Sequence, residues 1–124
     1  MAIELSPEVK QLCQEVRRFI RKEVDPRSRW IEENDRWPDD LMQKTRELGL
    51  FGLTIPEEYG GIGVNLAGKC AIEEEMGRTN YGFSTVIANH TGIGTTGIVA
   101  LGRMRRSAST CRAWPPANGS AASR

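Results

Sequence analysis

The sequence LGLFGLTIPEEYGG, residues 48–61, is the stretch from which the fold of this chain can be worked out. It begins with apolar residues at helical spacing and stops at Pro56, which lacks a backbone donor and keeps the preceding residue out of α geometry. Gly60 and Gly61 follow two carboxylates and a tyrosine, and glycine readily adopts the positive φ of a sharp reversal. We therefore expect one helix to end near Gly49 and a tight loop to lead into the next.

Helices are predicted on the N-terminal side of this stretch. Ser6 can cap a helix whose first residue is proline, and apolar residues then recur every three or four positions as far as Val24. Asp25-Pro26 is expected to end or kink this helix. Pro38 opens a second helix, with two aspartates at its positive end.

On the C-terminal side, Asn65 can cap a helix that runs to about Arg78. The glutamates at residues 73–75 resemble a run of general bases, but such a run is more typical of a solvated helix face. Leu66, Ala67, Cys70 and Ala71 are expected on one side of this helix, its apolar face, with Glu74 next to them.

Length and composition restrict the classes of protein to which this chain can belong. A chain of 124 residues forms one domain with a modest core. It holds no run of about 18 apolar residues, so we expect no membrane span. The N-terminus has an acid early and no basic segment before an apolar one, unlike a secretory signal. Cys13 and Cys70 fall on apolar helix faces, where a thiol acts as a small core hydrophobe, so a reducing, cytoplasmic location fits best.

Charge divides the chain near Gly102. Residues 1–102 hold 12 of the 17 basic residues and all 16 acids, a balance of −4, whereas residues 103–124 hold five arginines and no acid. That C-terminal segment also lacks Leu, Ile, Val, Phe and Tyr. We expect it to be a disordered tail outside the helical domain.

Two sequence patterns resemble chemical sites but lack the residues that such sites need. Residues 92–97 match the G-x-G-x-x-G pattern of dinucleotide-binding folds, but no acid follows at the required distance and the tail cannot form a second strand. His90 is the only histidine and has no Cys, Asp or Glu at metal-ligand spacing, which argues against a metal site. We interpret it as a helix histidine near a domain boundary.

The order of helix, ELGLFGL, IPEEYGG, GIG and helix resembles the N-terminal helical domain of the acyl-CoA dehydrogenases, over roughly residues 6–102. The resemblance implies an all-α helical bundle. It also implies a parent enzyme with a middle β-domain and a C-terminal helical domain, which together bind FAD and supply the catalytic glutamate. No catalytic, flavin-binding or metal-binding residue is therefore expected in this chain.

The same resemblance implies a role for residues 80–102, which are similar to the helix pair that forms one wall of the family's acyl-chain pocket. Thr85, Asn89 and Ile93 match positions that face the pocket. Their spacing of four residues independently places them on one side of a helix. We expect the intact parent to act on an acyl-CoA substrate, to pass electrons to a partner protein and to form a homodimer or homotetramer. We do not expect it to bind nucleic acid.

The tail departs from the family. Read in a shifted frame with one consistent choice of codons, residues 102–124 encode TDAQKREYLPGMATGEWIGSLA, which resembles the continuation that family members have. Trp114-Pro115 yields alanine in that frame with any codons, and Asn118-Gly119 yields only tryptophan or arginine. We therefore interpret residues 103–124 as an out-of-frame tail and the chain as an inactive fragment of a flavin-dependent enzyme. The alternative is a stand-alone helical interaction module without catalysis.

Overall fold

The computed structural model describes residues 4–101, which form α-helices joined by short π and 3-10 turns and include no strand. This confirms the all-α fold, while the predicted tail lies outside the described residues. The α-helices are α1 (Pro7–Phe19), α2 (Ser28–Asn34), α3 (Asp39–Glu47), α4 (Leu66–Met76), α5 (Tyr81–Asn89) and α6 (Thr96–Leu101).

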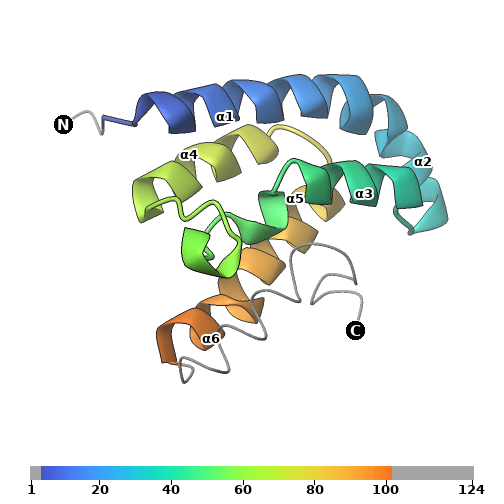
Figure 1. Ribbon diagram of the computed structural model, residues 1–124. Coiled ribbons are helices and arrows are strands. Elements are labelled where there is room, and N and C mark those ends of the chain that lie inside the picture. Colours follow the sequence, from blue (N-terminus) through green and yellow to red (C-terminus); the bar gives the residue numbers. More distant parts are fainter. Residues whose placement is uncertain (1–3, 102–124) are drawn as a thin grey trace.

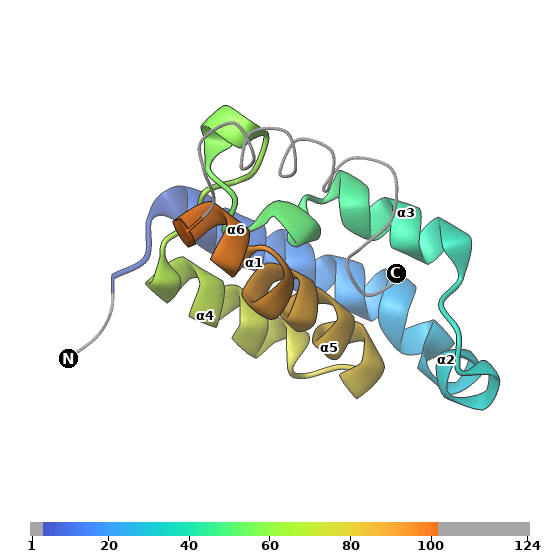
Figure 2. The ribbon, with the colours of Figure 1, turned by 90° about the horizontal axis from the view of Figure 1, so that it is seen from below.

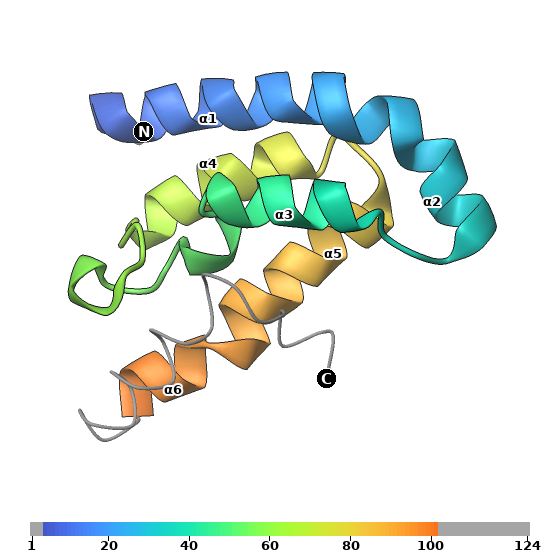
Figure 3. The same ribbon diagram turned by 45° about the vertical axis from the view of Figure 1, so that its right-hand side comes forward.

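Helix α1 is the longest element and lies along one edge of the molecule, with α3, α4, α5 and α6 beneath it in the view of Figure 1. Helices α1 and α4 run side by side in the same direction, with Val9 near Gly68 at one end and Arg17 bonded to Glu75 at the other. Seen from below, α3 and α4 lie on opposite sides of α1 (Figure 2). Helix α5 crosses beneath them, and α6 extends from its end away from α1 (Figure 3). The pocket-wall candidates therefore lie on α5 and on the turn that leads from it toward α6.

One hydrophobic core joins α1, α3, α4 and α5. Phe83 of α5 is completely buried and lies between two aromatic rings, with centroid distances of 4.9 Å to Trp37 and 6.2 Å to Phe19. Aromatic rings at these separations attract one another beyond the area they bury. The buried members of the cluster are Val16, Ile20, Val24, Ile31, Leu41, Leu50, Phe51, Leu53, Ile72, Met76, Phe83 and Ile87.

The predicted helix caps are confirmed. The Ser6 hydroxyl accepts a hydrogen bond from the Val9 amide at 3.3 Å, and the Asn65 side chain accepts one from the Gly68 amide at 2.8 Å. The predicted kink at Asp25-Pro26 is confirmed as well. Helix α1 passes into a π-helical turn at Ile20–Val24 and a 3-10 turn at Asp25–Arg27 before α2 begins.

The stretch that begins at Leu48 forms two 3-10 turns, Leu50–Gly52 and Glu57–Tyr59. Helix α3 ends just before Gly49, which has a φ of 82°, and Gly60 has a φ of 89°, both as predicted. The prediction for Gly61 was wrong, because its φ is not positive. Glycine is needed there for lack of space, since a Cβ atom would lie 2.0 Å from the Ile55 carbonyl oxygen.

The apolar side of α4 predicted from the sequence is not the side that is buried. Leu66 is 76% exposed, and Cys70 and Glu74 are exposed too, so Cys70 is not a core hydrophobe. The residues that face the core are Gly68, Ile72, Glu75 and Met76. Gly68 allows α1 to approach closely, and Arg17 of α1 neutralises Glu75, so tertiary contacts rather than local hydrophobicity orient this helix.

Candidate functional site

The candidate site is the outward side of α5 and of the π-helical turn that follows it, η5 (His90–Gly94). Asn80 caps α5 by accepting a hydrogen bond from the Phe83 amide at 3.2 Å. The inward side of α5 is fixed by Phe83 and Ile87, both completely buried. Packing on one side therefore determines which residues the other side presents.

The three predicted pocket residues lie away from this buried side. Thr85 is half-buried and Asn89 is exposed, both on α5. Ile93 belongs to η5, and its side chain is 86% exposed. Four residues are close to one turn in an α-helix and in the wider π-helix, so the change of helix type keeps Ile93 on the side of Asn89.

The chain segment on this side of the domain carries no charge of its own, although Lys69 of α4 reaches it, with Nζ 4.0 Å from where a Cβ atom of Gly92 would lie. No Asp, Glu, Lys or Arg occurs between residues 79 and 101. His90 is completely buried beneath it, and desolvation lowers the pKa of its imidazole to about 4, so the ring is neutral at pH 7. An apolar side chain in a segment without charged residues suits contact with a hydrocarbon chain.

The turn η5 is attached to the stretch that starts at Leu48. The His90 ring meets the Phe51 ring edge to face, with centroids 5.0 Å apart and planes at 71°. The Thr54 hydroxyl donates a hydrogen bond to the Thr91 carbonyl at 3.3 Å. Thr54 and Thr91 were not predicted from the sequence, because no local pattern links positions 37 residues apart.

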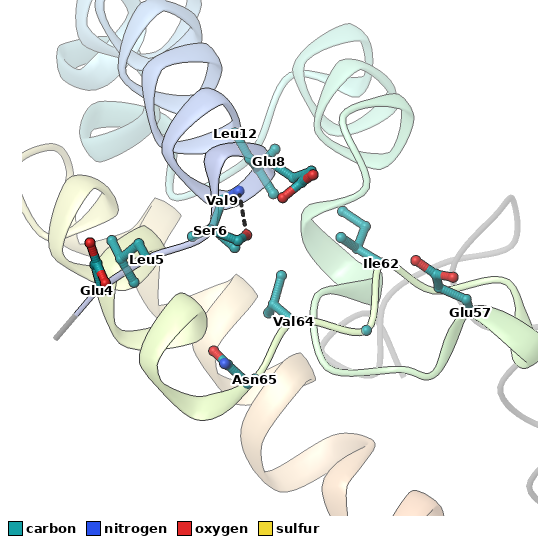
Figure 4. A pocket seen from close by; sticks show the side chains of 11 residues that line it. Glu4, Leu5, Ser6, Glu8, Val9, Leu12, Glu57, Ile62, Val64 and Asn65 are labelled. Atoms are coloured by element: carbon teal, nitrogen blue, oxygen red, sulfur yellow. Dashed lines mark hydrogen bonds between the residues drawn. The ribbon is translucent and has the colours of Figure 1, made fainter.

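A second concave region was not predicted from the sequence. A groove of about 520 Å³ lies between the start of α1 and the residues just before α4 (Figure 4). Val9, Ile62 and Val64 give it an apolar floor. Its other lining residues are Glu4, Leu5, Ser6, Glu8, Leu12, Glu57, Gly63 and Asn65.

This groove does not fit a flavin dinucleotide. It carries three carboxylates, Glu4, Glu8 and Glu57, and no lysine or arginine to neutralise a diphosphate. The pKa of Glu8 is lowered by a hydrogen bond from its own backbone amide and then by one from the Ser6 hydroxyl, so this carboxylate stays ionised. The groove therefore repels the phosphates of FAD and of coenzyme A.

Residues 4–101 offer little support for other kinds of site. The prediction that the glutamates of α4 form one solvated face was wrong for Glu75. This side chain is only 8% exposed and receives two hydrogen bonds from Arg17. The nucleotide-type glycine motif lies in helical turns and not after a strand. Within the described part of the chain, no three His, Cys, Asp or Glu residues are placed to hold a metal ion. None of its helices is long and apolar enough to cross a membrane.

Comparison with known proteins points to one family. The model of the family described as "Acyl-CoA dehydrogenase, N-terminal domain" matches residues 6–107. An acyl-CoA dehydrogenase of Bacillus subtilis (strain 168) is 33% identical over 87 residues, which are 70% of this chain and 23% of the relative. The glutaryl-CoA dehydrogenase of Desulfococcus multivorans is 38% identical over 81 residues, which are 63% of this chain and 21% of the relative.

A solved structure agrees in both sequence and fold. The acyl-CoA dehydrogenase of Bacillus anthracis, solved in complex with FAD, is 32% identical and superposes with a TM-score of 0.76. The match covers 88% of this chain and 19% of that one. The chain thus spans less than a quarter of the length of each of these three proteins.

Proposed function

The chain belongs to the acyl-CoA dehydrogenase family, in which it corresponds to the N-terminal domain, and we propose that it supplies one wall of an acyl-chain pocket. The wall consists of Thr85, Asn89 and Ile93. The observation that carries the proposal is the 86% exposure of Ile93 in a segment without charged residues. An isoleucine placed in this way gains stability once another apolar surface covers it.

In the proposed parent enzyme, an acyl-CoA thioester loses an α-proton and a β-hydride to become the α,β-unsaturated product. FAD supplies the acceptor for that hydride, and the family resemblance assigns the glutamate that takes the proton to a later domain. The acidic lining of the groove, which has no lysine or arginine, supports a flavin site elsewhere in the parent. The part of this domain would be to exclude water from the acyl chain and to limit its length.

Substitution of Ile93 tests the pocket wall. In the parent enzyme with all its domains, Ile93→Trp is expected to lower kcat/KM for long acyl groups more than for short ones. A conflict the size of one methylene changes kcat/KM by roughly 10–200-fold. Leu66→Trp, at a similarly exposed position on α4, is the matched control and should leave the chain-length profile unchanged. An unchanged profile in Ile93→Trp would mean that this side of the domain does not face the substrate.

We further propose that the 124-residue chain alone holds no flavin and has no dehydrogenase activity, because the cofactor cleft and the catalytic base belong to the rest of the parent. Electron transfer to a partner protein and assembly into a dimer or tetramer are likewise proposed for the parent alone. The purified chain should show no flavin absorbance near 450 nm and no turnover of acyl-CoA with an artificial acceptor. A purified chain that is yellow because it carries a bound flavin would contradict this proposal.

Residues 103–124 are proposed to be read out of frame. They lie outside the described residues, and the family match reaches residue 107, a few positions beyond the boundary inferred at Gly102. Sequencing the gene downstream tests this idea directly. A shifted frame that encodes a β-domain and a helical domain would support the interpretation of this chain as a fragment. The absence of such a frame would favour a stand-alone interaction module.

A further inference from the structure

The carbonyl oxygen of Thr91 lies at the point where α5 changes to π-helical geometry. In a continuous α-helix it would accept a hydrogen bond from the Thr95 amide. That amide instead donates to the His90 carbonyl, five residues back, at 3.0 Å. A polar atom released in this way inside a protein needs another donor.

Threonine hydroxyls are the donors that surround the Thr91 carbonyl oxygen. The hydroxyls of Thr96, Thr54 and Thr95 lie 2.9, 3.3 and 3.4 Å from the Thr91 oxygen. The Thr91 hydroxyl itself donates to the Ile87 carbonyl at 2.9 Å. Thr91 and Thr95 are completely buried, so water cannot replace these hydrogen bonds.

Of the three donors, Thr54 is the one that lies far from η5 in the sequence. Thr95 and Thr96 follow η5 directly and move with it, whereas Thr54 belongs to the stretch between α3 and α4. Its neighbours Leu53 and Ile55 are completely buried, so its position is fixed relative to the core. A hydrogen bond from Thr54 can therefore orient η5 against the rest of the domain.

We propose that Thr54 is a positioning residue, whose hydrogen bond to Thr91 holds the π-helical turn and thereby sets the direction of Ile93 and α6. Phe51 contributes a second contact, edge to face with the His90 ring. Thr54 thus determines the shape of the wall without lining it. The consequence for acyl-chain length rests on the proposed function, whereas the positioning itself does not.

Hydrogen exchange of backbone amides in the 124-residue chain tests the positioning. The reporter is the Thr95 amide, bonded to His90, and the reference is the Ile20 amide, bonded to Val16 in α1. In Thr54→Val, which removes the hydroxyl and keeps the shape, the ratio of Thr95 to Ile20 exchange rates should rise about three- to tenfold. Thr54→Ser, which retains the hydroxyl, should keep the wild-type ratio.

Two further variants separate positioning from a general loss of stability. Thr54→Ala also removes the hydroxyl and should raise the ratio as Thr54→Val does. Thr45→Val removes a buried hydroxyl that bonds to Leu41 within α3, and it should change both exchange rates by the same factor. The proposal is overturned if the ratio stays constant in Thr54→Val and Thr54→Ala, or if Thr54→Ser raises it equally.

Chain-length profiles of the parent enzyme distinguish this inference from the proposed function. If Ile93→Trp and Thr54→Val both shift the profile, both proposals are supported. If Ile93→Trp shifts it and Thr54→Val does not, Thr54 is not a determinant of selectivity and the pocket wall stands. If neither variant shifts it, the pocket wall itself fails.

Discussion

Glu75 is an acidic residue held at the interface of two helices by one arginine. Arg17 donates from Nε to its carboxylate at 2.9 Å and makes a second hydrogen bond through the other guanidinium nitrogen. The pKa of Glu75 is lowered, mainly by the hydrogen bond from Arg17 and against the effect of desolvation. The ionised carboxylate is therefore the form that stabilises the contact between α1 and α4.

We expect Arg17→Met to destabilise the chain at pH 7, because it leaves a buried carboxylate without its counter-ion. Since the pKa of Glu75 is lower in the folded state, the stabilisation is complete above the unfolded value near 4.5 and is lost as the pH falls below it. Urea unfolding at pH 7 and at pH 3 measures both effects. Arg18→Met, at the next and exposed position, is the control, and equal losses in the two variants would contradict the prediction.

His90 predicts a second pH dependence, in a different range. Burial lowers the pKa of His90 from 6.5 to about 4, so the unfolded state takes up a proton more readily. Stability is complete above pH 6.5 and falls as the pH drops toward 4, by about 1.4 kcal/mol per pH unit. Between pH 7.5 and pH 5, the unfolding free energy should decrease by about 2 kcal/mol.

The control is His90→Gln, which cannot be protonated and should unfold with the same free energy at both pH values. If the wild type and His90→Gln lose equal stability between pH 7.5 and pH 5, His90 is not the group responsible.

At the scale of elements, the loop after Pro56 depends on two adjacent glycines for different reasons. Gly60 needs a positive φ, but a Cβ atom there would meet nothing within 4 Å. Gly61 has ordinary φ, but its Cβ atom would overlap the Ile55 backbone, at 2.0 Å from the oxygen. One position is restricted by backbone conformation and the other by space.

Alanine substitutions should separate these restrictions. Gly60→Ala is expected to cost about 1–2 kcal/mol, the penalty of left-handed geometry for a residue with a Cβ atom. Gly61→Ala should cost more, about 3 kcal/mol or above, because backbone must move before it fits. Gly60→Asn is the matched control, since asparagine tolerates left-handed φ. Thermal unfolding of the three variants measures the order, and a Gly61→Ala variant as stable as Gly60→Asn would contradict it.

At the scale of the whole molecule, large apolar side chains remain exposed at the end of the domain remote from α1. Ile93 is 86% exposed and Leu101, the last described residue, is 88% exposed. Apolar surface contributes roughly 25 cal/mol per Å² when it is covered, so a few hundred Å² left open forgo several kcal/mol. That loss is comparable with the total stability of a small domain, about 5–15 kcal/mol.

We therefore expect the isolated chain to be helical by circular dichroism, and to self-associate or to bind a hydrophobic dye strongly. Ile93→Asn should reduce the association measured by sedimentation, because it removes apolar surface from the face that lacks its cover. Leu66→Asn, an equally polar change on α4, should leave association unchanged. A wild-type monomer that binds no dye and unfolds sharply would instead support a stand-alone module.

Local chemistry encoded in the sequence determined where helices begin and end. Ser6, Asn65 and Pro56 act through hydrogen bonds and sterics within a few residues of themselves, so their effects could be predicted before any tertiary contact was known. The spacing of Thr85, Asn89 and Ile93 predicted one shared helical side for the same reason, and their role in the pocket is a proposal.

Tertiary structure alone decided which side of α4 is buried and how η5 is held. Glu75 can enter the core because Arg17, 58 residues away, supplies the opposite charge. Thr54 and Thr91 are 37 residues apart, and their hydrogen bond depends on a π-helical turn that releases a carbonyl oxygen. Such partners are brought together by packing, which no periodicity within one helix can encode. The capping residues need no distant partner, whereas a buried charge and a released carbonyl are stable only in the folded chain.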